Sequence, residues 1–141
     1  MTGSYKLIEN INYQSFLAIQ GVGWALRKAA DSANTTHHIT HNLADDTFRL
    51  NIVGLVSSDV TYKINGPAKV NMIRHKRFSD QMTYLPEGDG IKVTKVNKEE
   101  NYTIEVCRRL SKDRSRITME QKCVFDDGRS EQAIQIFKRV A

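Results

Sequence analysis

The segment from residue 12 to residue 33 is the only long stretch of this chain whose residue pattern fits an α-helix. Gly21 and Gly23 divide it into a shorter and a longer piece. In each piece, side chains recur at the spacing i, i+3, i+4 and i+7, which places them on one face of a helix. The first piece has Tyr13, Phe16, Leu17 and Gln20 at these positions, and the second has Val22, Ala25, Leu26 and Ala29. We therefore predict two short helices, each with one apolar stripe.

Nearly all of the remaining chain alternates between apolar and polar residues, as half-buried β-strands do. Ten strands are predicted, at residues 4–10, 36–43, 47–55, 60–64, 68–75, 78–85, 90–97, 102–110, 115–125 and 131–140. Short turns such as Asn65-Gly66-Pro67 and residues 86–90 favour antiparallel neighbours. Because a sheet of ten twisted strands tends to curl and close, we predict an all-β fold. This fold is a ten-stranded antiparallel up-and-down β-barrel with the helix-turn-helix as a lid over one end.

The composition excludes several classes of protein. A length of 141 residues predicts a single domain, residues 1–141, and 40% apolar with 26% charged residues is typical of a globular chain. No apolar run is long enough to span a membrane, and the first ten residues lack the apolar core of a signal peptide. Cys107 and Cys123 are too few for a disulfide scaffold and lack metal-site spacing. We therefore expect two free thiols in a reducing cytoplasm. We also expect a monomer, which the composition does not decide.

Polar residues interrupt faces that should form the interior of the barrel. Arg108 continues the strand face that carries Ile104 and Val106, and Gln121 and Gln135 interrupt two other apolar faces. A buried arginine without a partner would be costly. Either these strand ends reach solvent, or the interior is a wet cavity that holds an acceptor for Arg108. A barrel of about ten strands encloses space that its side chains cannot fill, which favours the cavity.

Four stretches match the motifs of one known family. They are Gly-Ser-Tyr-Lys-Leu at residues 3–7, Asn-Tyr-Gln-Ser-Phe-Leu at 12–17, Gly-Val-Gly-Trp-Ala-Leu-Arg-Lys at 21–28 and Gln-Ile-Phe-Lys-Arg-Val at 135–140. In these stretches the chain resembles the intracellular lipid-binding proteins, which include the fatty-acid-binding and cellular retinoid-binding proteins. The resemblance covers the whole chain. It implies a calycin-type barrel of two near-orthogonal sheets and a non-enzymatic carrier that needs no cofactor besides its bound lipid.

The resemblance also implies where the head group of a ligand would bind. The family holds it with two cationic or polar residues and an aromatic hydroxyl. Arg108 matches the first of these, Gln135 stands where a second arginine is common, and Phe137 stands where a tyrosine is common. The pair Gln135 and Phe137 resembles retinol-binding members, whereas Arg108 resembles fatty-acid-binding members. Such a hybrid could hold a carboxylate or a hydroxyl group.

Further ligand contacts follow from the same resemblance. They are Tyr13 and Leu17 on the lid, Tyr62 on a strand, Arg77 at the portal, and Ile117 and Met119 on the wall. The basic lid residues Arg27 and Lys28 imply transient contact with anionic membranes or entry into the nucleus. The last hairpin, around residues 123–130, is longer than is usual in the family.

Other signals point to weaker hypotheses. The histidines at positions 37, 38 and 41 predict an exposed polar strand rather than a metal site, because no carboxylate or cysteine lies at ligand spacing. A net charge of +5 fits a solvated basic face, or a basic barrel that binds nucleic acid. We find no run of aromatic residues interleaved with Lys and Arg, so we expect no nucleic-acid partner. No acid–base pair, phosphate loop or triad is present, so we expect no enzymatic activity.

These observations leave a ranked set of functions. The first is a carrier of a long-chain fatty acid or a similar amphiphile, with its head group at Arg108 and Gln135. The alternatives are a cellular retinol- or retinoid-binding protein and, from a different class, a basic nucleic-acid-binding module.

Overall fold

The computed structural model describes residues 1–32, 34–88 and 90–141. Ala33, at the end of the predicted helical segment, and Asp89, inside a predicted turn, lie outside the described residues. The two helices are α1 (Tyr13–Ile19) and α2 (Trp24–Ser32). The strands are β1 (Gly3–Ile11), β2 (Thr36–Asn42), β3 (Thr47–Val53), β4 (Ser58–Lys63), β5 (Lys69–Ile73), β6 (Lys76–Tyr84), β7 (Gly90–Asn97), β8 (Tyr102–Leu110), β9 (Arg116–Phe125) and β10 (Ser130–Arg139). Each predicted strand is thus confirmed, with small shifts at the ends.

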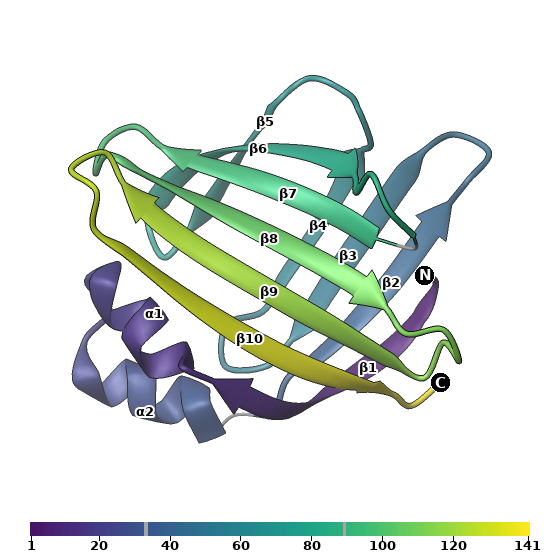
Figure 1. Ribbon diagram of the computed structural model, residues 1–141, viewed down its shortest axis with the longest axis horizontal. Helices are drawn as coiled ribbons and strands as arrows, with labels where there is room; N and C mark the ends of the chain where they lie inside the picture. The colour runs from purple at the N-terminus through teal and green to yellow at the C-terminus, as the bar shows by residue number, and fades with distance from the viewer. Residues whose placement is uncertain (33, 89) are drawn as a thin grey trace.

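All ten strands belong to one antiparallel sheet in the order β4-β3-β2-β1-β10-β9-β8-β7-β6-β5. Pairing of β1 with β10 joins the two ends of the chain, so the up-and-down order wraps into a nearly closed barrel. Strands β2–β4 cross behind β7–β10, and both helices lie at one end (Figure 1). Among the described residues β4 and β5 share no ladder, which leaves a gap in the barrel wall at this point. The predicted fold class is therefore confirmed.

The turn between the helices depends on glycine. Gly21 has a φ of 83°, in the left-handed region that side chains disfavour, and its N–H donates to the Ala18 carbonyl oxygen at 3.0 Å. At the other end of α1, the Asn12 side-chain amide donates to Glu131 Oε2 at 3.0 Å and to the Gln132 carbonyl oxygen at 2.7 Å. These contacts fix α1 against β10, and α1 buries Phe16 and Leu17.

Helix α2 differs from its prediction. None of its residues is buried, although its sequence has the predicted stripe. Of that stripe only Val22, which precedes the helix, is buried, and Leu26 is exposed. The reason is position, because α2 lies beside α1 at one end of the barrel (Figure 1). Leu26 and Ala30 line the mouth of the cavity instead of a packed core.

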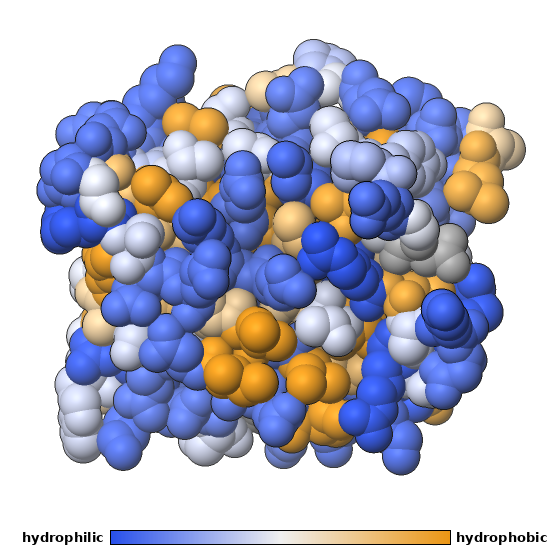
Figure 2. All heavy atoms as spheres, in the orientation of Figure 1, coloured by the Kyte–Doolittle hydropathy of each residue, from blue (hydrophilic) through white to orange (hydrophobic). Residues whose placement is uncertain are grey.

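Alternation along the strands separates an apolar interior from a polar exterior. Large side chains such as Tyr5, Phe48, Phe78 and Tyr102 are fully buried. The side of the molecule seen in Figure 2 is mostly hydrophilic, with a local group of apolar side chains over β1 and β10. The long final hairpin keeps regular pairing up to Ser130 and Val124. Among the described residues, no helix is long and apolar enough to cross a membrane.

Candidate ligand-binding cavity

The barrel encloses a cavity of about 460 Å³ beneath the helices. Its wall includes side chains of α1, α2 and strands on every side of the barrel, and apolar residues contribute most of it. Cavities of 300–1,000 Å³ with a mostly apolar wall and few polar groups are typical small-molecule sites. The interior is therefore hollow, which the sequence analysis left open.

Arg108 is the polar group that most distinguishes this cavity. It lies on the inward face of β8 beyond Ile104 and Val106, lines the cavity and is only 5% exposed. Its guanidinium makes no hydrogen bond or ion pair with any described residue, and its Nε is buried without a partner. Burial lowers the pKa of Arg108 to about 10, and the nearby Tyr62 opposes this shift. Arg108 is therefore still a cation at neutral pH, and its interior position excludes the interpretation that it reaches solvent.

Gln135 belongs to a chain of side-chain amides. Its Nε2 donates to Asn10 Oδ1 at 2.8 Å, and its Oε1 accepts from Gln121 Nε2 at 2.8 Å. Both Gln121 and Gln135 line the cavity. These three amides present neutral donors and acceptors on the cavity wall, and their hydrogen bonds to one another do not involve Arg108.

The structure brings most of the predicted contact residues together. Those that line the cavity are Tyr13, Leu17, Tyr62, Arg108, Met119 and Gln135. Ile117 and Phe137 are buried but lie outside the cavity lining. Arg77 is exposed and does not line the cavity, whereas its neighbour Arg74 does.

Comparisons with known proteins address the fold. No protein-family model matches the sequence, and no curated protein matches it. Solved structures do match over almost the whole chain. Lipid binding protein 8 of Caenorhabditis elegans, in its apo form, is 19% identical with a TM-score of 0.80, covering 99% of this chain and 94% of its own.

Two further structures match equally well. A Schistosoma mansoni fatty acid binding protein in complex with arachidonic acid is 20% identical with a TM-score of 0.78, covering 99% of this chain and 96% of its own. Human cRBP IV is 18% identical with a TM-score of 0.80, covering 99% and 98%. This chain has the fold of the fatty-acid-binding and cellular retinol-binding proteins. The resemblance inferred from sequence motifs is thereby confirmed at the level of the fold.

Within this fatty-acid-binding protein fold, His37 is a cavity residue that the sequence analysis placed wrongly on an exposed strand. It is 5% exposed, lines the cavity and packs against Phe137, with ring centroids 4.3 Å apart and the ring planes tilted by 34°. Burial, and then the nearby Arg108 charge, hold the pKa of His37 well below its usual value of 6.5. The sequence contained one indication of this position. Ile39 lies two residues after His37 and therefore on the same, inward face of β2. No group of His, Cys, Asp and Glu in the described chain could hold a metal ion.

Acidification is expected to destabilise the protein through His37. Because the folded-state pKa lies below the unfolded value of 6.5, the unfolded chain binds the proton more readily. The stability is therefore complete above pH 6.5 and falls as the pH drops below that value. Chemical denaturation between pH 7.5 and about 5, above the range in which exposed carboxylates titrate, should show this loss. A His37→Gln variant should flatten the dependence, and His38→Gln, at an exposed neighbour, should retain it; equal slopes in all three proteins would contradict the assignment.

A second polar cluster in the barrel was not predicted. The buried carboxylate of Asp80, on β6, accepts three hydrogen bonds at Oδ2, from Tyr62 Oη at 2.9 Å, Asn71 Nδ2 at 2.7 Å and Lys95 Nζ at 2.6 Å. Tyr62, Asn71 and Lys95 line the cavity, and Asp80 lies behind them. Burial, followed by the Asp80 charge, raises the pKa of Tyr62, so its hydroxyl stays a donor.

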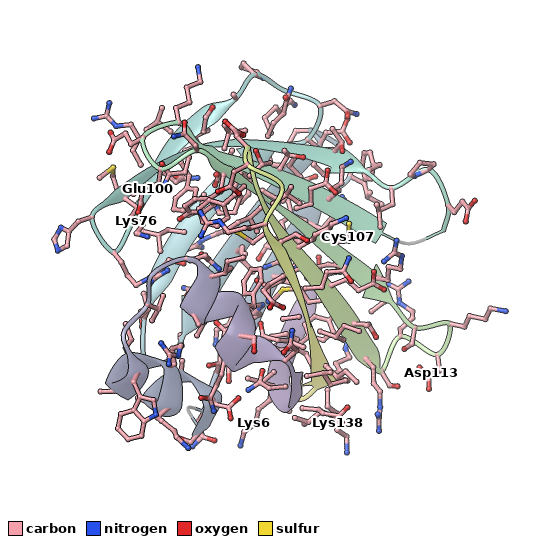
Figure 3. All side chains as sticks on the ribbon, turned by 60° about the vertical axis from the view of Figure 1, so that its left-hand side comes forward. Lys6, Lys76, Glu100, Cys107, Asp113 and Lys138 are labelled. Atoms are coloured by element: carbon pink, nitrogen blue, oxygen red, sulfur yellow. The ribbon has the colours of Figure 1, made fainter. Side chains whose placement is uncertain are left out.

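One lysine ties the lid to the barrel. Lys76 Nζ donates to the Gln20 carbonyl oxygen at 2.6 Å, where Gln20 caps the C-terminus of α1, and pairs with Glu100 at 3.0 Å. Figure 3 shows Lys76 and Glu100 beside one another at the end of the barrel that carries the helices. A cation at this end of a helix is favourable, because unpaired carbonyl groups give it a partial negative charge.

Proposed function

We propose that this protein is a non-enzymatic carrier that encloses one long-chain fatty acid or a similar amphiphile, with its acidic head group at Arg108. The observation that carries the proposal is the buried guanidinium, which faces the cavity and has no partner among the described residues. A buried charge is stable only when it is paired. A carboxylate that accepts hydrogen bonds from the guanidinium would supply this partner.

The rest of the cavity suits an alkyl chain. Tyr13 and Leu17 from the lid and Met119 from β9 would contact the tail, and Gln135 and Tyr62 would flank the head group. Ile117 and Phe137 would support the residues that line the cavity without touching the ligand. Arg77 would lie outside, at the portal. Burial of the tail provides about 0.8 kcal/mol per methylene, less the cost of ordering the ligand. Among the similar structures, a lipid binding protein and a fatty acid binding protein in complex with arachidonic acid support this ligand class.

Retinol is the second candidate ligand. The chain of neutral amides formed by Gln121, Gln135 and Asn10 could bind a hydroxyl group, and Phe137 offers no phenol to a carboxylate. The similarity to human cRBP IV supports this alternative. The two candidates differ in their dependence on Arg108, because a neutral hydroxyl gains little from a cation.

The carrier would work as a monomer in the cytoplasm, with transient contact to anionic membranes. The membrane contact is supported by the exposed face of α2, where Trp24 is 65% exposed and Lys28 lies 5.9 Å from its ring centre. Arg27 and Lys28 would provide attraction to acidic head groups.

Replacing Arg108 by glutamine is expected to weaken fatty-acid binding by about 10- to 100-fold. A hydrogen bond to a charged group contributes about 1.5–3 kcal/mol, and the variant would keep a neutral amide of similar reach. The test is a calorimetric titration of delipidated protein with oleic acid, oleyl alcohol and retinol. Affinity for the alcohol should change little in the variant.

An Arg109→Gln variant is the matched control, since Arg109 is exposed and pairs with Glu120 on the outer surface. It should bind oleic acid as the parent protein does. If oleic acid does not bind, or binds Arg108→Gln unchanged, the fatty-acid proposal is wrong. Tight binding of retinol alone would favour the second candidate.

A further inference from the structure

The cavity has a second polar region on the wall formed by Tyr62, Asn71 and Lys95, which lies near Arg108 but shares no hydrogen bond with it. These side chains come from β4, β5 and β7, and Asp80 holds all three by hydrogen bonds to one oxygen. The carboxylate side chain is fully buried and that of Lys95 is 13% exposed. The cluster is thus a fixed part of the wall rather than a mobile group at the rim.

The charges of this region distinguish it from the Arg108 region. Lys95 and Asp80 form an ion pair with an Nζ–Oδ2 distance of 2.6 Å, so together they carry no net charge. Such a region offers little to a second anion, whereas it suits a neutral polar group. Arg108, by contrast, has no ion-pair partner among the described residues and suits one carboxylate.

The cluster also leaves hydrogen-bonding capacity unused. Lys95 has three N–H groups, and of the described residues only Asp80 accepts a hydrogen bond from it. Asn71 bonds to Asp80 through its amide nitrogen, and its amide oxygen accepts no hydrogen bond from the described residues. A ligand group that accepts a hydrogen bond from Lys95 and donates one to the Asn71 amide oxygen would use both of these free positions. An alcohol has both abilities, and a ketone has the first.

The position of the cluster matches the middle of a chain-like ligand. In the β7–β8 ladder Lys95 lies opposite Ile104, and Ile91 lies opposite Arg108. Ile104 and Arg108 are four residues apart on the same strand, which corresponds to about 13 Å along the barrel wall. The Arg108 charge adds to the lowering of the Lys95 pKa, so the polar ends of these side chains lie closer together than their backbones. A carboxylate at Arg108 would therefore bring a carbon in the first half or at the middle of a long acyl chain near Lys95.

We propose that the preferred ligand is an oxygenated fatty acid, whose mid-chain hydroxyl or keto group binds to Lys95 and Asn71 while its carboxylate binds to Arg108. The inference rests on the proposed function, since it assigns the second polar group of the same ligand. A plain alkyl chain would cover the unused N–H groups of Lys95 without replacing their hydrogen bonds to water, and this costs affinity. The oxygenated chain avoids that loss.

The test compares octadecanoic acid with hydroxyoctadecanoic acids whose hydroxyl is moved stepwise along the chain. Delipidated full-length protein is titrated with each acid. We expect the affinity to peak for a mid-chain hydroxyl, at about tenfold or more above the plain acid. A double variant, Lys95→Met with Asp80→Leu, removes the polar cluster without leaving an unpaired charge, and it should reverse the preference toward the plain acid. A single Asn71→Leu variant should reduce the preference and covers the case in which the double variant does not fold.

The outcomes separate this inference from the proposed function. If both kinds of acid bind in an Arg108-dependent manner, but the plain acid binds as tightly as every hydroxy acid, the carrier function stands and the oxygenated ligand is wrong; the cluster then binds only water. A preference that is retained in the folded double variant, or in Asn71→Leu if the double variant does not fold, also overturns the assignment to this wall. If no acid binds the parent protein, both proposals fail.

Discussion

Replacing Asp80 by asparagine is expected to lower the free energy of unfolding by about 3–5 kcal/mol, because it removes the charge that compensates the buried Lys95. The two side chains face each other on paired strands, at directly opposite positions of the β6–β7 ladder. Burial already lowers the pKa of Lys95, while the Asp80 carboxylate counteracts that shift. Without the carboxylate, the folded protein must either keep an unpaired buried cation or release its proton, and both cost stability.

The location of Asp80 adds to the expected loss. The sheet has no ladder between β4 and β5 among the described residues, and the Asp80 carboxylate connects both strands through Tyr62 and Asn71. Few other contacts cross this gap; Lys69 Nζ donates to the Thr61 carbonyl oxygen at 3.0 Å on the exposed side. The buried cluster therefore stabilises the place where, in the part of the chain that the structure describes, backbone hydrogen bonding does not close the barrel.

Equilibrium denaturation with urea, followed by tryptophan fluorescence and circular dichroism, measures this effect. The melting temperature should fall by roughly 10 °C or more. The matched control is Asp59→Asn on β4, which breaks an ion pair with Arg49 whose side chains are 54% and 47% exposed. Exposed pairs contribute at most about 1 kcal/mol. Equal losses in the two variants would show that the Asp80 cluster is not a stabilising centre.

The sequence allowed a correct prediction of the fold because the relevant signals are local. Period-two alternation indicates strands whatever their partners, and Gly21 ends a helix because of its own backbone conformation. The same alternation placed Arg108 on the inward face of its strand, but it left open whether the side chain reaches solvent at the end of the barrel. Short turns then limited the strand order to neighbouring hairpins.

The second polar region could not be predicted because it depends on register between strands. Asp80 shares a face with Phe78 and Met82, but a charged residue there could equally indicate a solvent-facing bend. Its pairing with Lys95 becomes visible only when β6 and β7 are aligned. His37 was misplaced for a related reason, since the run of histidines outweighed the single apolar residue Ile39 on the same face. The apolar stripe of α2 was expected to be buried and is not. Helical periodicity shows which side chains share a face, but not whether that face packs on a core or borders a cavity.

Replacing Arg108 by leucine is expected to stabilise the ligand-free protein by about 1–4 kcal/mol, by analogy with the range found when buried ion pairs are exchanged for apolar groups of similar size. The guanidinium has a desolvation cost that the nearby Tyr62 opposes only in part, as its lowered pKa shows, and its Nε has no hydrogen-bond partner among the described residues. Such a cost is typical of a binding site in which the ligand supplies the missing partner. The same variant should lose most of its affinity for fatty acids.

Two measurements on delipidated protein test this opposition between stability and binding. Thermal unfolding without ligand should give a higher melting temperature for Arg108→Leu than for the parent protein. Saturating oleic acid should then raise the melting temperature of the parent protein, and much less that of the variant, because only a ligand that binds the folded state stabilises it. Arg109→Leu, at the exposed neighbouring position, should change neither result by much. A ligand-free Arg108→Leu variant that is less stable than the parent would mean that the guanidinium already has adequate partners in the empty barrel, and the strongest argument for an anionic ligand would be lost.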